Sequence, residues 1–158
     1  MVLRDPLLPS LLDRLSGEGD GPAVRFGFSQ DELIRSVLRD LAWLLNTTRL
    51  DAVQSLEGLP ETSRSVLNFG LDSLAGRMVG DVAESEVADS VERAIRTFEP
   101  RLRGVRVRAT KKLSGSRESI ALRIDAQLVV RPLRDVHIRG LLDLDRSEIL
   151  LTQSDGSE

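Results

Sequence analysis

Residues 98–109 read Phe-Glu-Pro-Arg-Leu-Arg-Gly-Val-Arg-Val-Arg-Ala, and the period of the hydrophobic pattern changes within this stretch. Before it, apolar residues recur every three or four positions, which is typical of one face of a helix. After Pro100 they alternate with arginines, which is typical of a half-buried strand. Proline disfavours helical geometry at Glu99 and cannot continue the hydrogen-bond ladder of a helix. The stretch therefore predicts a helix that ends at Phe98 and a strand that follows it.

Two amphipathic helices are expected before this corner. The first begins after Ser29, which has capping-box spacing with Glu32, and runs to about Asn46. The second covers about residues 83–98. Between them, Pro60 is well placed as the first residue of a short helix. The apolar stripes of the two main helices consist of Ile34, Val37, Leu38, Leu41 and Leu45, and of Val87, Val91, Ala94, Ile95 and Phe98.

Four consecutive strands are expected after the corner. Residues 120–130 alternate between two faces over their whole length, which is the clearest strand pattern in the chain. A basic strand precedes them at 101–112, and two more are expected at about 136–144 and 149–152. Helices followed by strands with short turns predict an α+β fold. We expect two main amphipathic helices packed on an antiparallel β meander of about four strands.

The length of 158 residues is typical of one domain. We expect residues 1–28 to form a short helix and a Gly-rich linker, residues 29–153 to form the single α+β domain, and residues 154–158 to form a polar tail. The N-terminal residues lack the apolar run of a signal peptide, and no stretch approaches the ~20 apolar residues that span a bilayer. These features predict a cytoplasmic protein with no membrane contact.

Few residues offer catalytic or metal-binding chemistry. The chain has no cysteine, and its one histidine, His137, lies in an expected strand. Ser-His-Asp catalysis would depend on this single residue, and no Asp/Glu cluster has the spacing of a calcium loop. Glu99 would be a poor glycosidase acid, because the neighbouring Arg101 favours its charged form. We expect no enzymatic activity, no catalytic residue, no metal and no cofactor.

The expected strand at 101–112 carries six basic residues in a chain of net charge −3. Strands that bind nucleic acid interleave aromatic residues for base stacking, and this run has none. An acidic protein partner or a solvated strand face explains the run better, so nucleic acid is not the expected partner. A small nucleic-acid-binding module that uses the 101–112 strand stays open as the alternative function. The basic residues are Arg101, Arg103, Arg106, Arg108, Lys111 and Lys112.

Three motifs, in this order and spacing, together resemble one protein family. They are Asp40-Leu-Ala-Trp-Leu-Leu-Asn-Thr47, Ser65-Val-Leu-Asn-Phe-Gly-Leu71 and Phe98-Glu-Pro-Arg-Leu102. The family is that of the sheath-initiator subunit (TssE) of type VI secretion baseplates, which is related to a baseplate wedge protein of contractile phage tails and is sometimes labelled lysozyme-like. The resemblance covers about residues 7–152. Two loops depart from the family pattern, where this chain has Thr48-Arg49 and Asp72-Ser73.

The resemblance implies a structural part of a contractile machine and not a catalyst. In such baseplates the Glu-Pro-Arg corner docks on the core bundle formed by two other wedge subunits. Glu99, Pro100 and Arg101 would have that role here. The sheet of the initiator resembles the strand-exchanging domain of a sheath subunit. The resemblance therefore implies that the sheet accepts extended arms of contractile sheath subunits and starts sheath polymerisation.

Two segments are candidate edges for this strand exchange. Natural edge strands avoid self-pairing by carrying charge or proline, and residues 103–112 and 131–139 have such features. The regular 120–130 strand is expected inside the sheet. We also expect the Glu99–Arg101 corner to lie outside the apolar stripes and Trp43 to lie in the core. The candidate edge residues are Arg106, Val107, Arg108, His137, Ile138 and Arg139.

Overall fold

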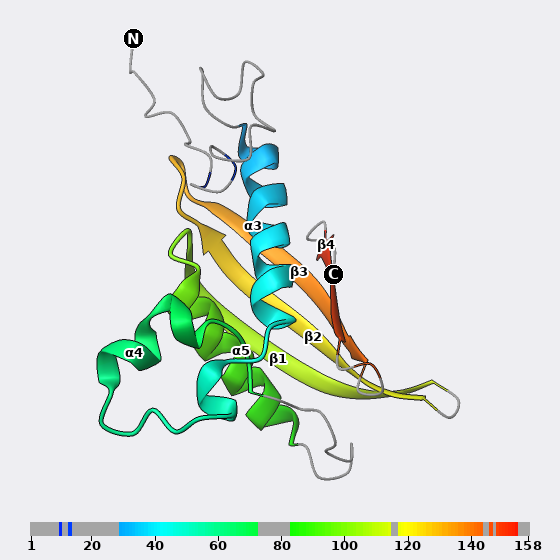
Figure 1. Cartoon of the computed structure of the whole chain (residues 1–158). Coiled ribbons are helices and arrows are strands. Elements are labelled where there is room, and N and C mark those ends of the chain that lie inside the picture. The colour runs from blue at the N-terminus through cyan, green and yellow to red at the C-terminus, as the bar shows by residue number, and fades with distance from the viewer. Residues whose placement is uncertain are drawn as a thin grey trace.

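The computed structural model describes residues 10, 13, 29–72, 83–114, 117–143, 146 and 148–154. Within these residues, helices and a four-stranded antiparallel sheet form the α+β fold that the sequence predicts. Figure 1 shows α3 (Gln30–Leu45) and α5 (Glu84–Phe98) against one face of the sheet, with α4 (Pro60–Arg64) farther from it. The linker expected within residues 1–28 and the tail after Ser154 lie outside the described residues, apart from Ser10 and Asp13.

The first main helix begins where its capping pattern predicts. The Ser29 hydroxyl accepts a hydrogen bond from the Glu32 amide (3.2 Å), and the Glu32 carboxylate accepts one from the Ser29 amide (2.8 Å). This reciprocal pair satisfies two donors that a helix start leaves without partners. Pro60 occupies the first turn of α4, as expected. The two 3₁₀ turns η1 (Leu50–Ala52) and η2 (Val66–Asn68) flank α4 in the segment between the main helices.

The strands are β1 (Leu102–Ser114), β2 (Arg117–Leu128), β3 (Arg134–Asp143) and β4 (Glu148–Ser154), and they lie in the sheet in that order. The expected meander is therefore confirmed, with β2 inside it. A bulge interrupts the pairing between Arg103 and Arg106. Gly104 has a φ of 60° at this bulge, a conformation that glycine adopts without a steric penalty.

One apolar core joins the inner face of the sheet to α3 and α5. Its fully buried side chains come from all of these elements and include Ile34, Leu41, Val91, Ile95, Ile120, Ile124, Leu128 and Ile138. Burying one such side chain contributes roughly 1.5–3 kcal/mol. The prediction that Trp43 belongs to this core is wrong, because Trp43 is 49% exposed. The inward stripe of α3 ends with Leu41, Leu44 and Leu45, and Trp43 lies beside it.

No helix in the described part of the chain is long and apolar enough to cross a membrane.

Candidate docking corner and sheet edges

The corner between α5 and β1 is held by an ion pair between Glu99 and Arg101. The Arg101 Nε donates to Glu99 Oε1 (2.7 Å), and Arg101 Nη2 donates to Glu99 Oε2. The backbone amide of Arg101 also donates to Glu99 Oε1 (3.1 Å). Pro100, the exposed residue between them, cannot donate a backbone hydrogen bond. The guanidinium therefore closes the turn that the proline starts.

This corner also binds α3. Arg101 Nη2 donates to Asp40 Oδ2 (2.6 Å), and Arg101 Nη1 donates to the Ser36 hydroxyl (3.2 Å). Burial lowers the pKa of Arg101, but its hydrogen bonds and charge interactions with Glu99 and Asp40 outweigh that effect and raise the pKa above its ordinary value. Glu99 is not part of the apolar stripes, but it is buried, with 4% of its surface exposed. The Arg101 fork is occupied within the chain.

The network continues along α3. Asp40 Oδ1 accepts hydrogen bonds from Arg39 Nε (3.1 Å) and Nη2 (2.8 Å), and Arg39 Nη1 donates to Asp13. Ser36 donates from its hydroxyl to Asp13 Oδ2 (2.9 Å). The hydrogen bond from Arg39 is the main reason that the pKa of Asp13 lies far below its usual range. Alternating carboxylates and guanidiniums thus link Asp13 to Glu99.

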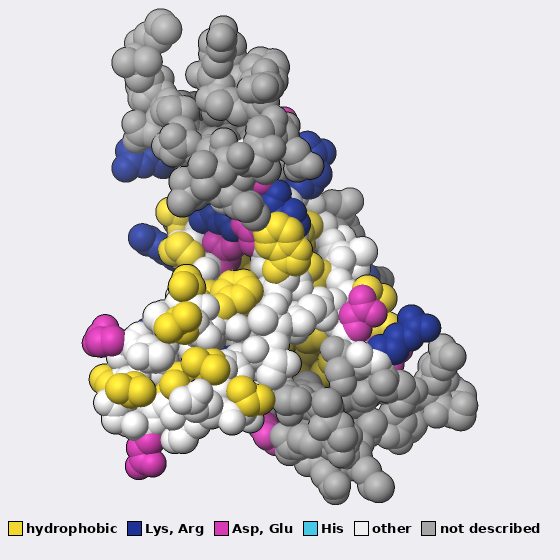
Figure 2. All heavy atoms as spheres, in the orientation of Figure 1, with side chains coloured by type: hydrophobic (Ala, Val, Ile, Leu, Met, Phe, Trp, Pro, Cys, Tyr) yellow, Lys and Arg dark blue, Asp and Glu magenta, His cyan; other side chains and the backbone are white. Residues whose placement is uncertain are grey.

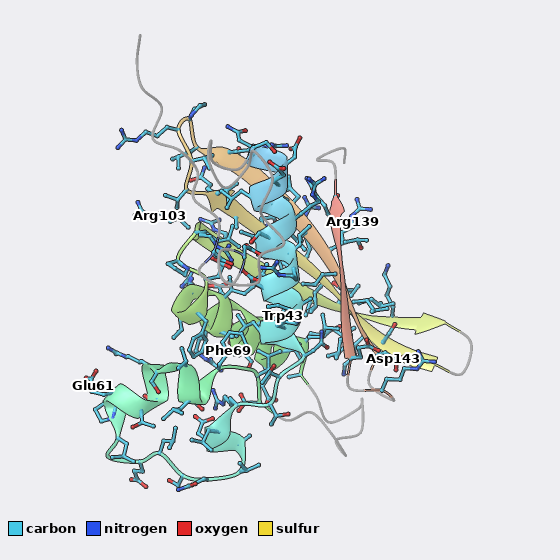
Figure 3. The ribbon with its side chains drawn as sticks, turned by 45° about the horizontal axis from the view of Figure 1, so that its top comes forward. Trp43, Glu61, Phe69, Arg103, Arg139 and Asp143 are labelled. Carbon is cyan, nitrogen blue, oxygen red and sulfur yellow. The ribbon has the colours of Figure 1, made fainter. Side chains whose placement is uncertain are left out.

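A groove of about 440 Å³ opens beside this network. Its apolar walls are Trp43, Phe69, Phe98 and Pro100, and its polar end includes Asp40 and Arg101. The Phe69 and Phe98 rings meet edge to face, with centroids 5.5 Å apart. Figure 3 labels Trp43 and Phe69 on the side of the molecule where this groove lies, and Figure 2 shows hydrophobic side chains gathered there and over α4. An apolar groove with one charged end suits an amphipathic partner.

The second sequence motif positions Phe69 in this groove. The buried Asn68 side chain accepts a hydrogen bond from the Asp51 amide (3.0 Å) and donates one to the Ser63 carbonyl (2.9 Å). Gly70 has a φ of 132°, and a Cβ there would lie 2.3 Å from the Thr47 carbonyl oxygen. Only glycine therefore allows this close approach of the two chain segments. The motif fixes the loop, and Phe69 reaches the groove from it.

One of the two candidate edges is wrong. Residues His137, Ile138 and Arg139 lie in β3, which pairs with β2 on one side and with β4 on the other. Ile138, for example, lies opposite Ile124 and opposite Gln153. Its backbone groups are used within the sheet, so this segment offers no edge.

The other candidate segment, Arg106, Val107 and Arg108, does lie on an edge strand, but α5 covers that edge. The amide of Val107 donates to Glu92 Oε2 (3.0 Å), and the amide of Lys111 donates to Glu84 Oε1 (2.7 Å). The Val105 carbonyl accepts a hydrogen bond from Arg96 Nη2 (2.9 Å). Three side chains on α5 therefore bind backbone groups that a new strand would need. These side chains are Glu84, Glu92 and Arg96.

The opposite edge, β4, is more accessible. The Asn46 side chain donates from Nδ2 to the Ile149 carbonyl (2.9 Å) and accepts from the Ile149 amide at Oδ1 (2.7 Å). Ile149 therefore directs both backbone groups away from β3. Because outward groups alternate along an antiparallel strand, Leu151 and Gln153 direct theirs outward too. No further strand of the described chain pairs with them.

The sequence pattern pointed to Glu99, Pro100 and Arg101. It did not point to Ser36 and Asp40, which bind Arg101, or to Arg39, which binds Asp40. It also did not point to Asn46, which binds the backbone of β4. The first motif contains Asp40 and Asn46, so a polar residue at each end of an apolar helix segment was the available signal. The described residues contain no group of three or more His, Cys, Asp or Glu side chains that could hold a metal ion.

A protein-family model described as baseplate wedge protein gp25 matches residues 31–133. The matched span begins in α3 and ends just before β3, so it contains the corner and the apolar walls of the groove. No curated protein and no solved structure matches the chain.

Proposed function

Because this chain belongs to the baseplate wedge protein gp25 family and is thus a structural baseplate component, we propose that it initiates the sheath of a contractile machine of the type VI secretion kind. It docks on the core bundle of two other wedge subunits through the groove beside Pro100. It then accepts an extended arm of a contractile sheath subunit at the outer edge of β4.

The edge of β4 is the observation that carries this proposal. Extended segments add to a sheet where a strand has outward N–H and C=O groups without partners. Leu151 and Gln153 offer such groups, whereas the corresponding groups of Val107 and Lys111 are bound by α5. Asn46 already occupies the position at Ile149 and so limits how far an added strand can extend.

The docking role of Glu99, Pro100 and Arg101 takes a different form from the one expected. Arg101 makes its hydrogen bonds within the chain, so the partner meets a preformed corner and not a free guanidinium fork. Pro100 and Trp43 are the exposed apolar parts of the groove. Exposed aromatic side chains next to arginine are frequent energetic centres of protein interfaces.

The alternative nucleic-acid function has less support. In the described part of the sheet, its outer face carries no Phe or Trp side chain on which bases could stack. Asp125 and Glu148 also lie among the residues of that face and would repel phosphates.

A proline substitution at Gln153 tests the β4 edge. Proline lacks the amide hydrogen and is tolerated on edge strands, so Gln153→Pro removes an outward donor without removing a bond to β3. We expect sheaths to fail to assemble while the wedge subunits still co-purify. Gln153→Ala, which keeps the amide, is the matched control and should assemble sheaths normally.

Microscopy of sheaths and co-purification of wedge subunits are measured in the same cells, and circular dichroism of the purified variants checks the fold. Normal sheath assembly by folded Gln153→Pro and Leu151→Pro variants would exclude β4 as the receiving edge. Loss of wedge co-purification in both variants would contradict the separation of docking and strand capture.

A further inference from the structure

Three arginines lie side by side on the outer face of the sheet. Arg108 of β1 pairs with Arg123 of β2, and Arg123 pairs with Arg139 of β3. Thr152 of β4 completes this arginine row at the other edge. All three arginines are exposed, and they come from strands that are separated in sequence by two turns. Arg139, labelled in Figure 3, is the member next to β4.

The arginine row is unfavourable for the isolated chain. Like charges directly opposite each other on neighbouring strands destabilise a sheet. Arg123 makes one weak contact, with Asp125 at 3.4 Å, and Asp125 makes a closer hydrogen bond to His137 (2.7 Å). Within the described residues, Arg108 and Arg139 form no ion pair. Two of the three positive charges are therefore uncompensated within the described residues, and the third is only weakly paired, on a face that the helices leave open.

The neighbouring row on the same face is apolar. Leu141 of β3 pairs with Leu150 of β4, and these side chains are 41% and 59% exposed. Thr110 and Ala121 continue this row toward β1. Strands in a sheet lie about 4.8 Å apart, so the three arginines span roughly 10 Å. The face thus offers a charged stripe and an apolar patch side by side.

We infer that this face is a second protein-binding surface, which receives an acidic segment of another baseplate or sheath protein. Carboxylates of that segment neutralise the arginine row, and its apolar side chains cover Leu141 and Leu150. This surface is separate from the groove at Trp43 and from the backbone edge of β4, so it does not depend on the proposed strand capture.

A polypeptide fits this face better than a nucleic acid does. A phosphate backbone would leave the Leu141–Leu150 pair exposed. An acidic and apolar segment uses both rows and keeps its carboxylates over the arginines.

Binding of the purified full chain to a fluorescent peptide of alternating Glu and Leu residues tests the inference at low salt. The row variant carries Arg108→Gln, Arg123→Gln and Arg139→Gln. The control variant carries Arg35→Gln, Arg64→Gln and Arg131→Gln, three exposed arginines outside the row, and has the same net charge. Because the row variant loses three exposed ion pairs with the peptide, we expect its affinity for the peptide to fall about tenfold. The affinity of the control variant should change little. Leu150→Ser, with the row intact, should also weaken binding.

A duplex DNA of similar charge is measured in parallel, and thermal unfolding checks each variant. If the row variant does not fold, the single Arg123→Gln variant is compared with Arg131→Gln in the same way. Equal loss of peptide binding in the row and control variants would mean that overall charge acts, and would overturn the inference. Tighter binding to the DNA than to the peptide would overturn it in favour of a nucleic-acid surface. No peptide binding by the unaltered chain would also overturn it, whereas the sheath assay with Gln153→Pro would be unaffected.

Discussion

The Asn46 side chain pairs with the backbone of Ile149 as a neighbouring strand would. Its amide nitrogen donates to the Ile149 carbonyl, and its carbonyl oxygen accepts from the Ile149 amide, at 2.9 and 2.7 Å. One side chain at the end of α3 therefore satisfies the first outward position of β4 and ties the helix to the sheet edge. The open part of the edge begins only at Leu151.

Replacing Asn46 with alanine should leave both backbone groups of Ile149 without these partners. We expect Asn46→Ala to lower the free energy of unfolding by about 1 kcal/mol, the usual net value of such hydrogen bonds. Urea denaturation measures the change, and Gln54→Ala, which removes an exposed amide side chain, is the control. An unchanged stability of Asn46→Ala would show that water replaces the side chain at no cost.

The Arg101 network should stabilise the fold as well as shape the corner. Lysine cannot bind both Glu99 oxygens and Asp40 at once, because it lacks the planar fork of arginine. We expect Arg101→Lys to lower the free energy of unfolding by about 2–3 kcal/mol. Arg103→Lys, at an exposed arginine two residues farther along in β1, is the matched control. If both variants unfold at the same urea concentration as the unaltered chain, the network does not stabilise the fold.

Much of the fold could be predicted because its signals are local. The capping box at Ser29, Pro60 and the change of period after Pro100 each act within a few residues. The partner of Arg101 on α3 could not be predicted in this way, because Asp40 lies 61 positions earlier in the chain.

The sequence contained evidence against a free edge at residues 131–139. The sequence already predicted a fourth strand near 149–152, and in a meander that strand must pair with the third. Charge and Pro132 around residues 131–139 were interpreted as protection of an edge, whereas β4 covers that strand. The cover of β1 by Glu84 and Glu92 depends on how α5 packs, which a periodicity does not reveal.

The ion pair of Asp13 predicts a pH dependence of stability. An aspartate has a pKa of about 3.9 in an unfolded chain, and the hydrogen bond from Arg39 lowers the pKa of Asp13 in the folded state. A lowered folded pKa contributes stability that is fully present above the unfolded value and is lost as the pH falls through the folded value. The stability difference between the unaltered chain and Asp13→Asn should therefore be constant near neutral pH and shrink below about pH 4.

Thermal unfolding between neutral pH and pH 3 measures this difference, and the Arg39→Gln background is the control. Without the guanidinium, which is the largest cause of the lowered pKa, the pH-dependent part of the difference should become much smaller. A difference that persists unchanged in Arg39→Gln would assign the effect to the Ser10 and Ser36 hydrogen bonds instead.

The groove predicts that Trp43 contributes to docking much more than to stability. Its side chain is half exposed beside Pro100, and Arg39 lies 5.0 Å from the centre of its ring. Tryptophan side chains at the centre of an interface commonly contribute 2 kcal/mol or more to binding, which is a factor of about 30 in affinity. We therefore expect Trp43→Ser to weaken binding to the purified wedge core bundle by at least about tenfold, with a small change in thermal stability. Val53→Ser removes an apolar side chain that is 79% exposed outside the groove and should leave binding unchanged. Equal affinities of Trp43→Ser and Val53→Ser in a titration would show that the wedge subunits bind elsewhere on the molecule.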